Sequence, residues 1–173
     1  RLRRAAGEAA AASQAVVTLA QVQQRMPARS TLLSFLATDE ALRVLVVPAG
    51  RPPRLLRLDL PRARLARDVA ALRARVLARA GSDDEDLRSS ARRLYDALLA
   101  PVAGELRGQR QLLLAPDGPL HDLPWAALHD GRRWLIEQHA LTIVDTLTDT
   151  QAAAQPRGEL LLGVADAGDR SEE

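Results

Sequence analysis

The reactions open to this chain are limited first by the side chains it contains. Its 173 residues include three histidines and one tyrosine, but no cysteine. Without a thiol, these residues cannot form a disulfide, a cysteine metal site or a cysteine nucleophile. A hydrolytic triad within the chain would instead need a histidine beside a serine.

His121 and the adjacent Asp122 come nearest to part of a Ser–His–Asp triad. The candidate nucleophiles are Ser30, Ser34 and Ser89. None of these serines stands in the Gly-x-Ser-x-Gly context that joins a strand to a helix through a sharp turn. We therefore expect the histidines to lie in turns and to form no catalytic triad within the chain.

Motifs for metals, phosphates and cofactors are also missing. His121, His129 and His139 do not have the spacing of paired zinc ligands on a helix. No Gly-x-Gly-x-x-Gly or Walker sequence occurs to cradle a phosphate. We expect neither a metal nor a cofactor.

The charges nearly balance. There are 24 basic and 22 acidic residues, and every basic residue is arginine. Because arginine stays protonated to high pH, the pI of about 10.2 does not indicate a basic surface. Arginines surround the helix expected after Pro61, which leaves nucleic-acid binding as an alternative. They lie on several sides of that helix, and few aromatic residues could stack on bases, so we expect a solvated surface and no nucleic-acid partner.

Apolar patterning predicts the elements of the first half. Residues 3–26 read as a helix that ends before Pro27. The ranges 31–38, 41–48 and 54–58 read as the strands of an antiparallel meander. Two antiparallel helices are expected over 61–80 and 85–106, with Pro61 in the first helical position of one and a break at Pro101 in the other. The core positions predicted from these faces and from the next strand are Leu65, Leu72, Leu94, Leu98, Leu112 and Leu114.

The pattern of elements over the whole chain predicts an α/β or an α+β fold, and of these we expect α/β. A continuous apolar run at 111–115 is typical of a central strand. Strands are expected at 134–137, 140–144 and 159–164, with a helix at 148–154 and a polar tail over 166–173. No apolar run approaches the roughly 18–20 residues that a membrane span needs, so we expect no membrane partner.

The most distinctive segment is the string L-L-L-A-P-D-G-P-L-H-D-L-P-W-A-A-L at 112–128. Local chemistry predicts a buried strand, then a turn in which Asp117 bonds its own backbone and Gly118 takes a positive φ. The string also resembles the L-x-x-x-P-D-G-x-L-x-x-L-P-[FW]-A-A-L motif of CHAT domains, which are caspase-like modules found mostly in bacteria, often after tetratricopeptide repeats. The motif residues, for which we expect a structural role, are Pro116, Asp117, Gly118, Leu120, Leu123, Pro124, Trp125, Ala126 and Leu128.

Other segments resemble CHAT motifs in the family's order. They lie at 26–35, 94–101 and 134–137, and 159–164 resembles the strand that opens the caspase-like core. A departure follows Val144, where Asp145 and Thr146 replace the usual Pro-Ser. The resemblance implies the N-terminal portion of a three-layer caspase-like fold. Its expected parts are a helix linking to an upstream region (1–26), an N-terminal subdomain (27–156), and the first core strand with a polar tail (157–173).

The resemblance also implies a function. Relatives of this kind are cysteine peptidases with a His–Cys dyad, in which the imidazole helps to form the attacking thiolate, or related signalling proteins. Both dyad motifs follow the strand at 159–164 in the family, so no residue here is assigned a catalytic role. Asp166 and Asp169, after that strand, are candidates for binding a basic substrate residue, with a solvated tail as the alternative.

Two functions agree with these sequence features. The first is the N-terminal, non-catalytic part of a cytoplasmic caspase-like cysteine protease. Its partners would be a C-terminal CHAT segment that carries the dyad and a protein substrate. The alternative is a non-catalytic interaction or scaffold module, a pseudo-peptidase, in bacterial signalling or defence. A partner polypeptide with the dyad motifs would favour the first.

Overall fold

The computed structural model describes residues 18–78 and 85–144. This part of the chain is an α/β fold built on one five-stranded sheet, in the order β3-β2-β1-β4-β5. The strands are β1 (Ser30–Ala37), β2 (Leu42–Pro48), β3 (Arg54–Leu58), β4 (Gln111–Ala115) and β5 (Ala140–Ile143). The first three form an antiparallel meander, whereas β4 pairs in parallel with both β1 and β5. The predicted meander and central strand are both confirmed.

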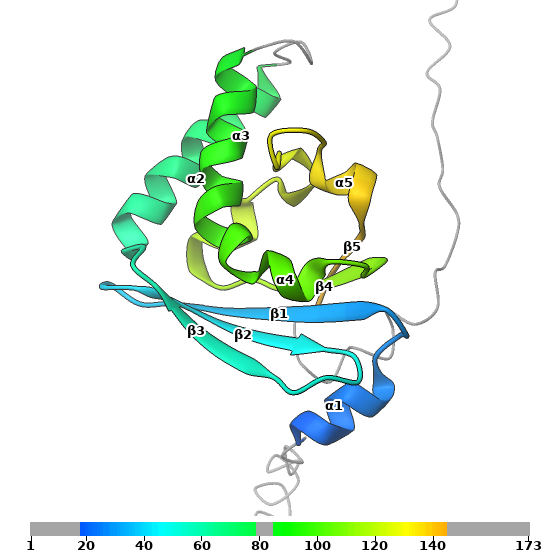
Figure 1. Ribbon diagram of the computed structural model, residues 1–173. Helices are drawn as coiled ribbons and strands as arrows, with labels where there is room; N and C mark the ends of the chain where they lie inside the picture. The colour runs from blue at the N-terminus through cyan, green and yellow to red at the C-terminus, as the bar shows by residue number, and fades with distance from the viewer. Residues whose placement is uncertain (1–17, 79–84, 145–173) are drawn as a thin grey trace, which may run out of the picture.

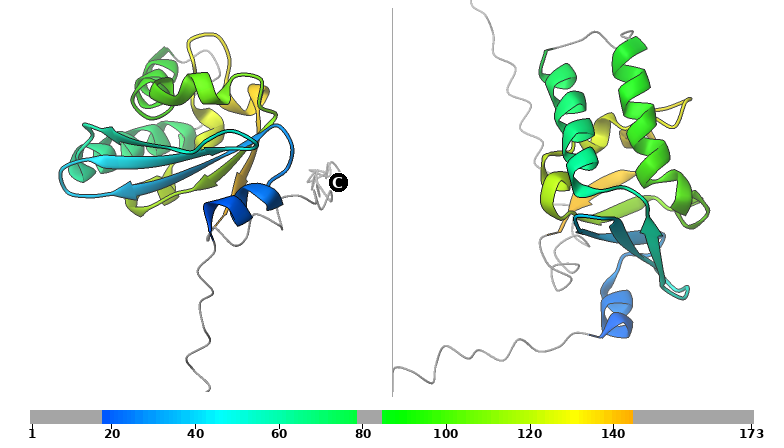
Figure 2. Two further views of the ribbon diagram at one scale, coloured as in Figure 1. Left: turned by 60° about the horizontal axis from the view of Figure 1, so that its bottom comes forward. Right: turned by 90° about the vertical axis from the view of Figure 1, so that its left-hand side faces the viewer.

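One face of the sheet is covered by most of the helical segments (Figures 1 and 2). The two long helices are α2 (Arg62–Leu77) and α3 (Glu85–Leu98). Pro101 interrupts the second predicted helix as expected, because a 3-10 turn, η1 (Ala100–Val102), separates α3 from the short α4 (Ala103–Leu106). Three more short segments, η2 (Gly118–Asp122), η3 (Trp125–Ala127) and α5 (Leu135–Gln138), lead from β4 to β5.

The main core lies between this face of the sheet and the helices. Alternate residues of β1 and β2, such as Leu33 and Val44, point into it and meet the apolar stripes of α2 and α3. The predicted core positions are all buried, namely Leu65, Leu72, Leu94, Leu98, Leu112 and Leu114. The helix after Pro61 therefore packs as one unit with the sheet.

The opposite face of the sheet carries the short helix α1 (Leu19–Arg25), which lies apart from the other helices in Figure 1. Val22 and Met26 pack there against Leu32 and Leu113 of the sheet. Thr18 caps the helix, because its hydroxyl accepts a hydrogen bond from the Gln21 N–H at 3.3 Å. The sheet thus has helices on both faces. Residues 3–17 of the predicted helix lie outside the described residues.

Two predictions about the helices and strands are wrong. The pattern at 134–137 predicts a strand, but this range contains the start of α5. Glu137 accepts a hydrogen bond from the Trp134 N–H at 2.7 Å, which caps this single turn and directs Leu135 into the core. Pro61 is the N-cap of α2 and not its first helical residue, since its carbonyl accepts the first helical bond, from Leu65.

The predicted helix at 148–154, the strand at 159–164 and the polar tail lie outside the described residues. Of the boundaries between the expected parts of the chain, 1–26, 27–156 and 157–173, the one at 156 also lies outside the described residues. Within 18–78 and 85–144, no helix is both long and apolar enough to cross a membrane.

Candidate functional site

The motif segment at 112–128 leaves the sheet where β4 ends. β4 lies between β1 and β5, and its three middle residues are buried. Ala115 pairs with Ser34, so β1 continues beyond the end of β4 as far as Ala37. Pro116 has no backbone N–H and ends the strand there. The following residues therefore meet a part of β1 that has no neighbour in β4.

Asp117 bonds the part of β1 that has no neighbour in β4. Its Oδ2 accepts a hydrogen bond from the Ala37 N–H at 2.8 Å. The prediction that the Asp117 side chain bonds its own turn is therefore wrong. Its backbone carbonyl is the group that takes part in the turn, by accepting from the Leu120 N–H at 3.2 Å. Asp117 acts as a clamp between β1 and the segment after β4.

Gly118 starts the turn η2 with a φ of 54°, so its predicted positive φ is confirmed. A Cβ at this position would meet Arg62 and Ala37 only at ordinary van der Waals distance. The need for glycine therefore comes from the backbone conformation, which L side chains rarely adopt.

The apolar motif residues return the chain to the core. Leu120, Leu123, Trp125 and Leu128 are all buried. The Trp125 ring lies 5.3 Å from the Phe35 ring, centroid to centroid, and its buried indole N–H has no hydrogen-bond partner among the described residues. The remaining motif residues are less buried: Pro116 and Pro124 are half-buried and Ala126 is exposed. The motif residues therefore have a structural role, because they hold the backbone of this segment in place and fill the core.

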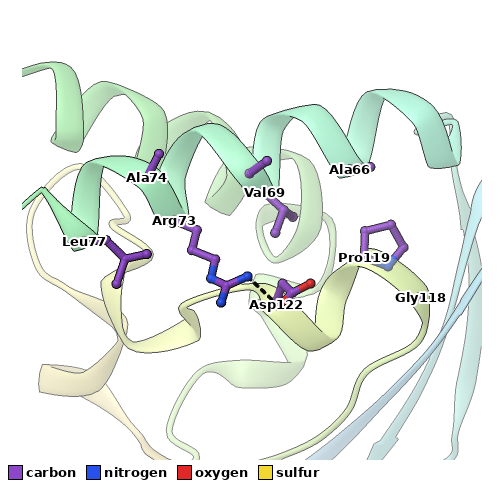
Figure 3. Close-up of a pocket in the computed structure, with 9 residues that line it drawn as sticks. Ala66, Val69, Arg73, Ala74, Leu77, Gly118, Pro119 and Asp122 are labelled. Atoms are coloured by element: carbon purple, nitrogen blue, oxygen red, sulfur yellow. Dashed lines mark hydrogen bonds and ion pairs between the residues drawn. The ribbon is translucent and has the colours of Figure 1, made fainter.

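A groove of about 540 Å³ runs between α2 and η2 (Figure 3). Arg73 and Asp122 span it with an ion pair of 2.8 Å between Nη1 and Oδ1. The rest of the wall is made mainly by small or apolar residues, including Ala66, Val69 and Pro119. No sequence pattern singles out this ion pair, because nothing local links two residues that are 49 positions apart.

Within 18–78 and 85–144, the histidines do not form a catalytic group with the candidate residues. His121 is exposed, and its neighbour Asp122 pairs with Arg73. His129 packs edge-on against Trp134 with ring centroids 4.7 Å apart. The Nδ1 of His139 lies 3.1 Å from the Gln109 carbonyl. Burial, together with the charge of Arg133, lowers the pKa of His139 below 6.5 despite that hydrogen bond.

The candidate serines have structural positions. Ser30 donates to the Pro27 carbonyl at 2.7 Å, and the Ser89 hydroxyl accepts from Arg93 at 2.9 Å. Ser34 lies within β1. Among the described residues, no three His, Cys, Asp or Glu side chains are placed to hold a metal ion. The candidate substrate residues Asp166 and Asp169 lie outside the described ranges.

Comparison with known protein families gives a match to the second half of the chain. The model of the CHAT domain family matches residues 88–172. This range contains the motif segment, most of α3, and β4 and β5, whereas the segment at 26–35 lies before it. No curated protein matches the chain.

Proposed function

We propose that this chain, which belongs to the CHAT domain family of caspase-like proteins, forms the N-terminal, non-catalytic part of a cysteine protease. A C-terminal segment would supply the His–Cys dyad, and the substrate would be a protein. We place this activity in the cytoplasm.

The observation that carries the proposal is the absence of cysteine from a chain of this family. A thiolate is the nucleophile in the family's reaction, so none of the 173 residues can take that part. The motif residues have structural contacts, such as the clamp from Asp117 to Ala37. These features suit a part of an enzyme that supports a catalytic site without contributing the nucleophile.

The edge of the sheet suggests where the dyad segment would join. Among the described strands, β5 has a neighbour on one side only. The N–H groups of Ala140 and Val144 point toward β4, where they bond the carbonyls of Arg110 and Leu114 at 2.8 Å. The alternate residues Leu141 and Ile143 therefore direct their N–H groups to the open side.

Parallel strands are usually buried on both faces. Ile143 is instead 52% exposed in the described structure. We propose that the sheet grows from β5 through residues 159–164 and then through the C-terminal segment. The alternative function, a scaffold module without activity, uses the same edge but needs no dyad.

Reconstitution tests the proposal. The chain alone should not hydrolyse a library of fluorogenic peptides. Addition of a purified C-terminal CHAT segment with its His and Cys should produce hydrolysis. The matched control is the same segment with its Cys replaced by Ala, which should bind but remain inactive. Binding of the native segment without hydrolysis would favour the scaffold function, and hydrolysis by the chain alone would refute the proposal.

A further inference from the structure

A groove rich in arginine lies between α3 and the segment 129–137, on the helical side of the sheet. Its volume is about 700 Å³. Two carboxylates line it, those of Glu85 and Glu137. The arginines that line it are Arg88, Arg92, Arg93, Arg132 and Arg133. Positive charge therefore outnumbers negative charge in this groove, although the whole chain is close to neutral.

Much of this positive charge is not neutralised inside the described structure. Arg93 bonds the hydroxyls of Ser89 and Ser90, at 2.9 and 3.0 Å. Arg132 and Arg133 are exposed, and neither side chain has a carboxylate partner within the described ranges. These three guanidinium groups can therefore bind a carboxylate from outside the chain.

The loop that carries Arg132 and Arg133 is held in place. Asp130 Oδ1 accepts the backbone N–H groups of both arginines, at 2.7 and 2.8 Å. Burial tends to raise the pKa of Asp130, but these bonds and one from Gln138 lower it below its usual value. The carboxylate therefore stays ionised and fixes the turn.

The other wall of the groove is fixed by Arg92. Its Nε lies 3.1 and 3.0 Å from the two carboxylate oxygens of Asp96, one turn along α3. Its guanidinium lies against Gly131, where a Cβ would overlap Nη1. Gly131 also has a φ of 99°. The loop and the helix thus meet at a position where the positive φ favours glycine.

We propose that this groove binds an acidic peptide segment of a partner protein. A guanidinium group can donate two parallel hydrogen bonds to one carboxylate, so arginines on both walls of the groove can bind successive acidic side chains. Trp134, packed edge-on against His129, offers an apolar surface beside them. A single-stranded nucleic acid fits less well, because its binding uses a series of aromatic rings, and Trp134 is the one Trp, Tyr or Phe among the described lining residues.

Fluorescence anisotropy tests this inference. The probe is a fluorescein-labelled tetraglutamate peptide, and the control is a tetraglutamine peptide whose side chains are uncharged. The tetraglutamate peptide should bind saturably, more weakly as salt is added, while the tetraglutamine peptide should not bind. The double variant Arg132→Gln, Arg133→Gln should weaken binding about tenfold or more.

A control variant loses the same charge elsewhere. Arg43 and Arg57 face each other across β2 and β3. They lie on the opposite face of the sheet from α3, because Leu42 and Val44 on either side of Arg43 point into the main core. Their replacement by Gln should leave the affinity nearly unchanged. Gly131→Ala keeps every charge but displaces Arg92, so it should weaken binding while circular dichroism shows a retained fold.

Three results would overturn the proposal. The first is that tetraglutamate shows no saturable binding. The second is that the two double variants lose the same amount of affinity for tetraglutamate. The third is that a single-stranded oligonucleotide binds whereas tetraglutamate does not. None of these outcomes bears on the proposed protease function, which the reconstitution assay tests separately.

Discussion

Replacing Asp117 by alanine removes the clamp between β1 and the motif segment. The bond from the Ala37 N–H to Oδ2 is 2.8 Å long, and Ala37 is 7% exposed. A hydrogen bond to a charged group contributes about 1.5–3 kcal/mol, and its loss here leaves a largely buried N–H without its acceptor. We expect Asp117→Ala to lower the free energy of unfolding by about 2 kcal/mol. In a chain of this size that corresponds to a fall in Tm of about 4–8 °C.

Urea unfolding followed by circular dichroism measures this loss, and amide exchange of Ala37 locates it. Asp117→Asn keeps a neutral acceptor and should cost about 1 kcal/mol, less than alanine. Asp122→Ala is the matched control, because the side chains of Asp122 and Arg73 are 62% and 54% exposed and their pair should contribute less than about 1 kcal/mol. Equal losses for Asp117→Ala and Asp122→Ala, with unchanged exchange at Ala37, would refute the clamp.

Three further predictions concern single residues. Gly118→Ala should destabilise the protein by about 1–2 kcal/mol because of its positive φ, whereas Gly104→Ala, on α4 with open space beside its Cα, should be neutral or stabilising in the same unfolding assay. Trp125→Phe removes an indole N–H that has no partner in the described structure, and it should cost much less than Trp125→Ala, for which about 3–5 kcal/mol is expected. The lowered pKa of His139 means that the unfolded chain binds its proton first, so stability should fall as pH drops through 6.5, and His139→Gln should reduce that fall in urea titrations.

The sequence is most informative where a structural requirement is local. A positive φ at Gly118 follows from the Asp-Gly pair between apolar segments, which needs such a turn. The apolar residues Leu112 and Leu114 indicate a central strand, because a strand buried on both faces needs a continuous apolar run. Pro101 indicates the break after α3 for an equally local reason.

The sequence is least informative where the partner is distant in the chain. The Asp117 side chain bonds Ala37, 80 positions away, and no pattern near Asp117 distinguishes that bond from one within its own turn. The residues from Trp134 to Glu137 predict a strand, yet the Glu137 cap and the burial of Leu135 select a helical turn. The arginine groove depends on Gly131 bringing the loop to Arg92, a contact that no local pattern indicates.

In the proposed enzyme, a C-terminal segment completes the sheet beside residues 159–164. Hydrogen–deuterium exchange at residues 159–164 tests this pairing, with and without the C-terminal CHAT segment. We expect these amides to exchange substantially more slowly once the segment is added, while the exchange of the β1 amides is unchanged. Equal exchange rates of these amides with and without the segment would refute the proposed pairing.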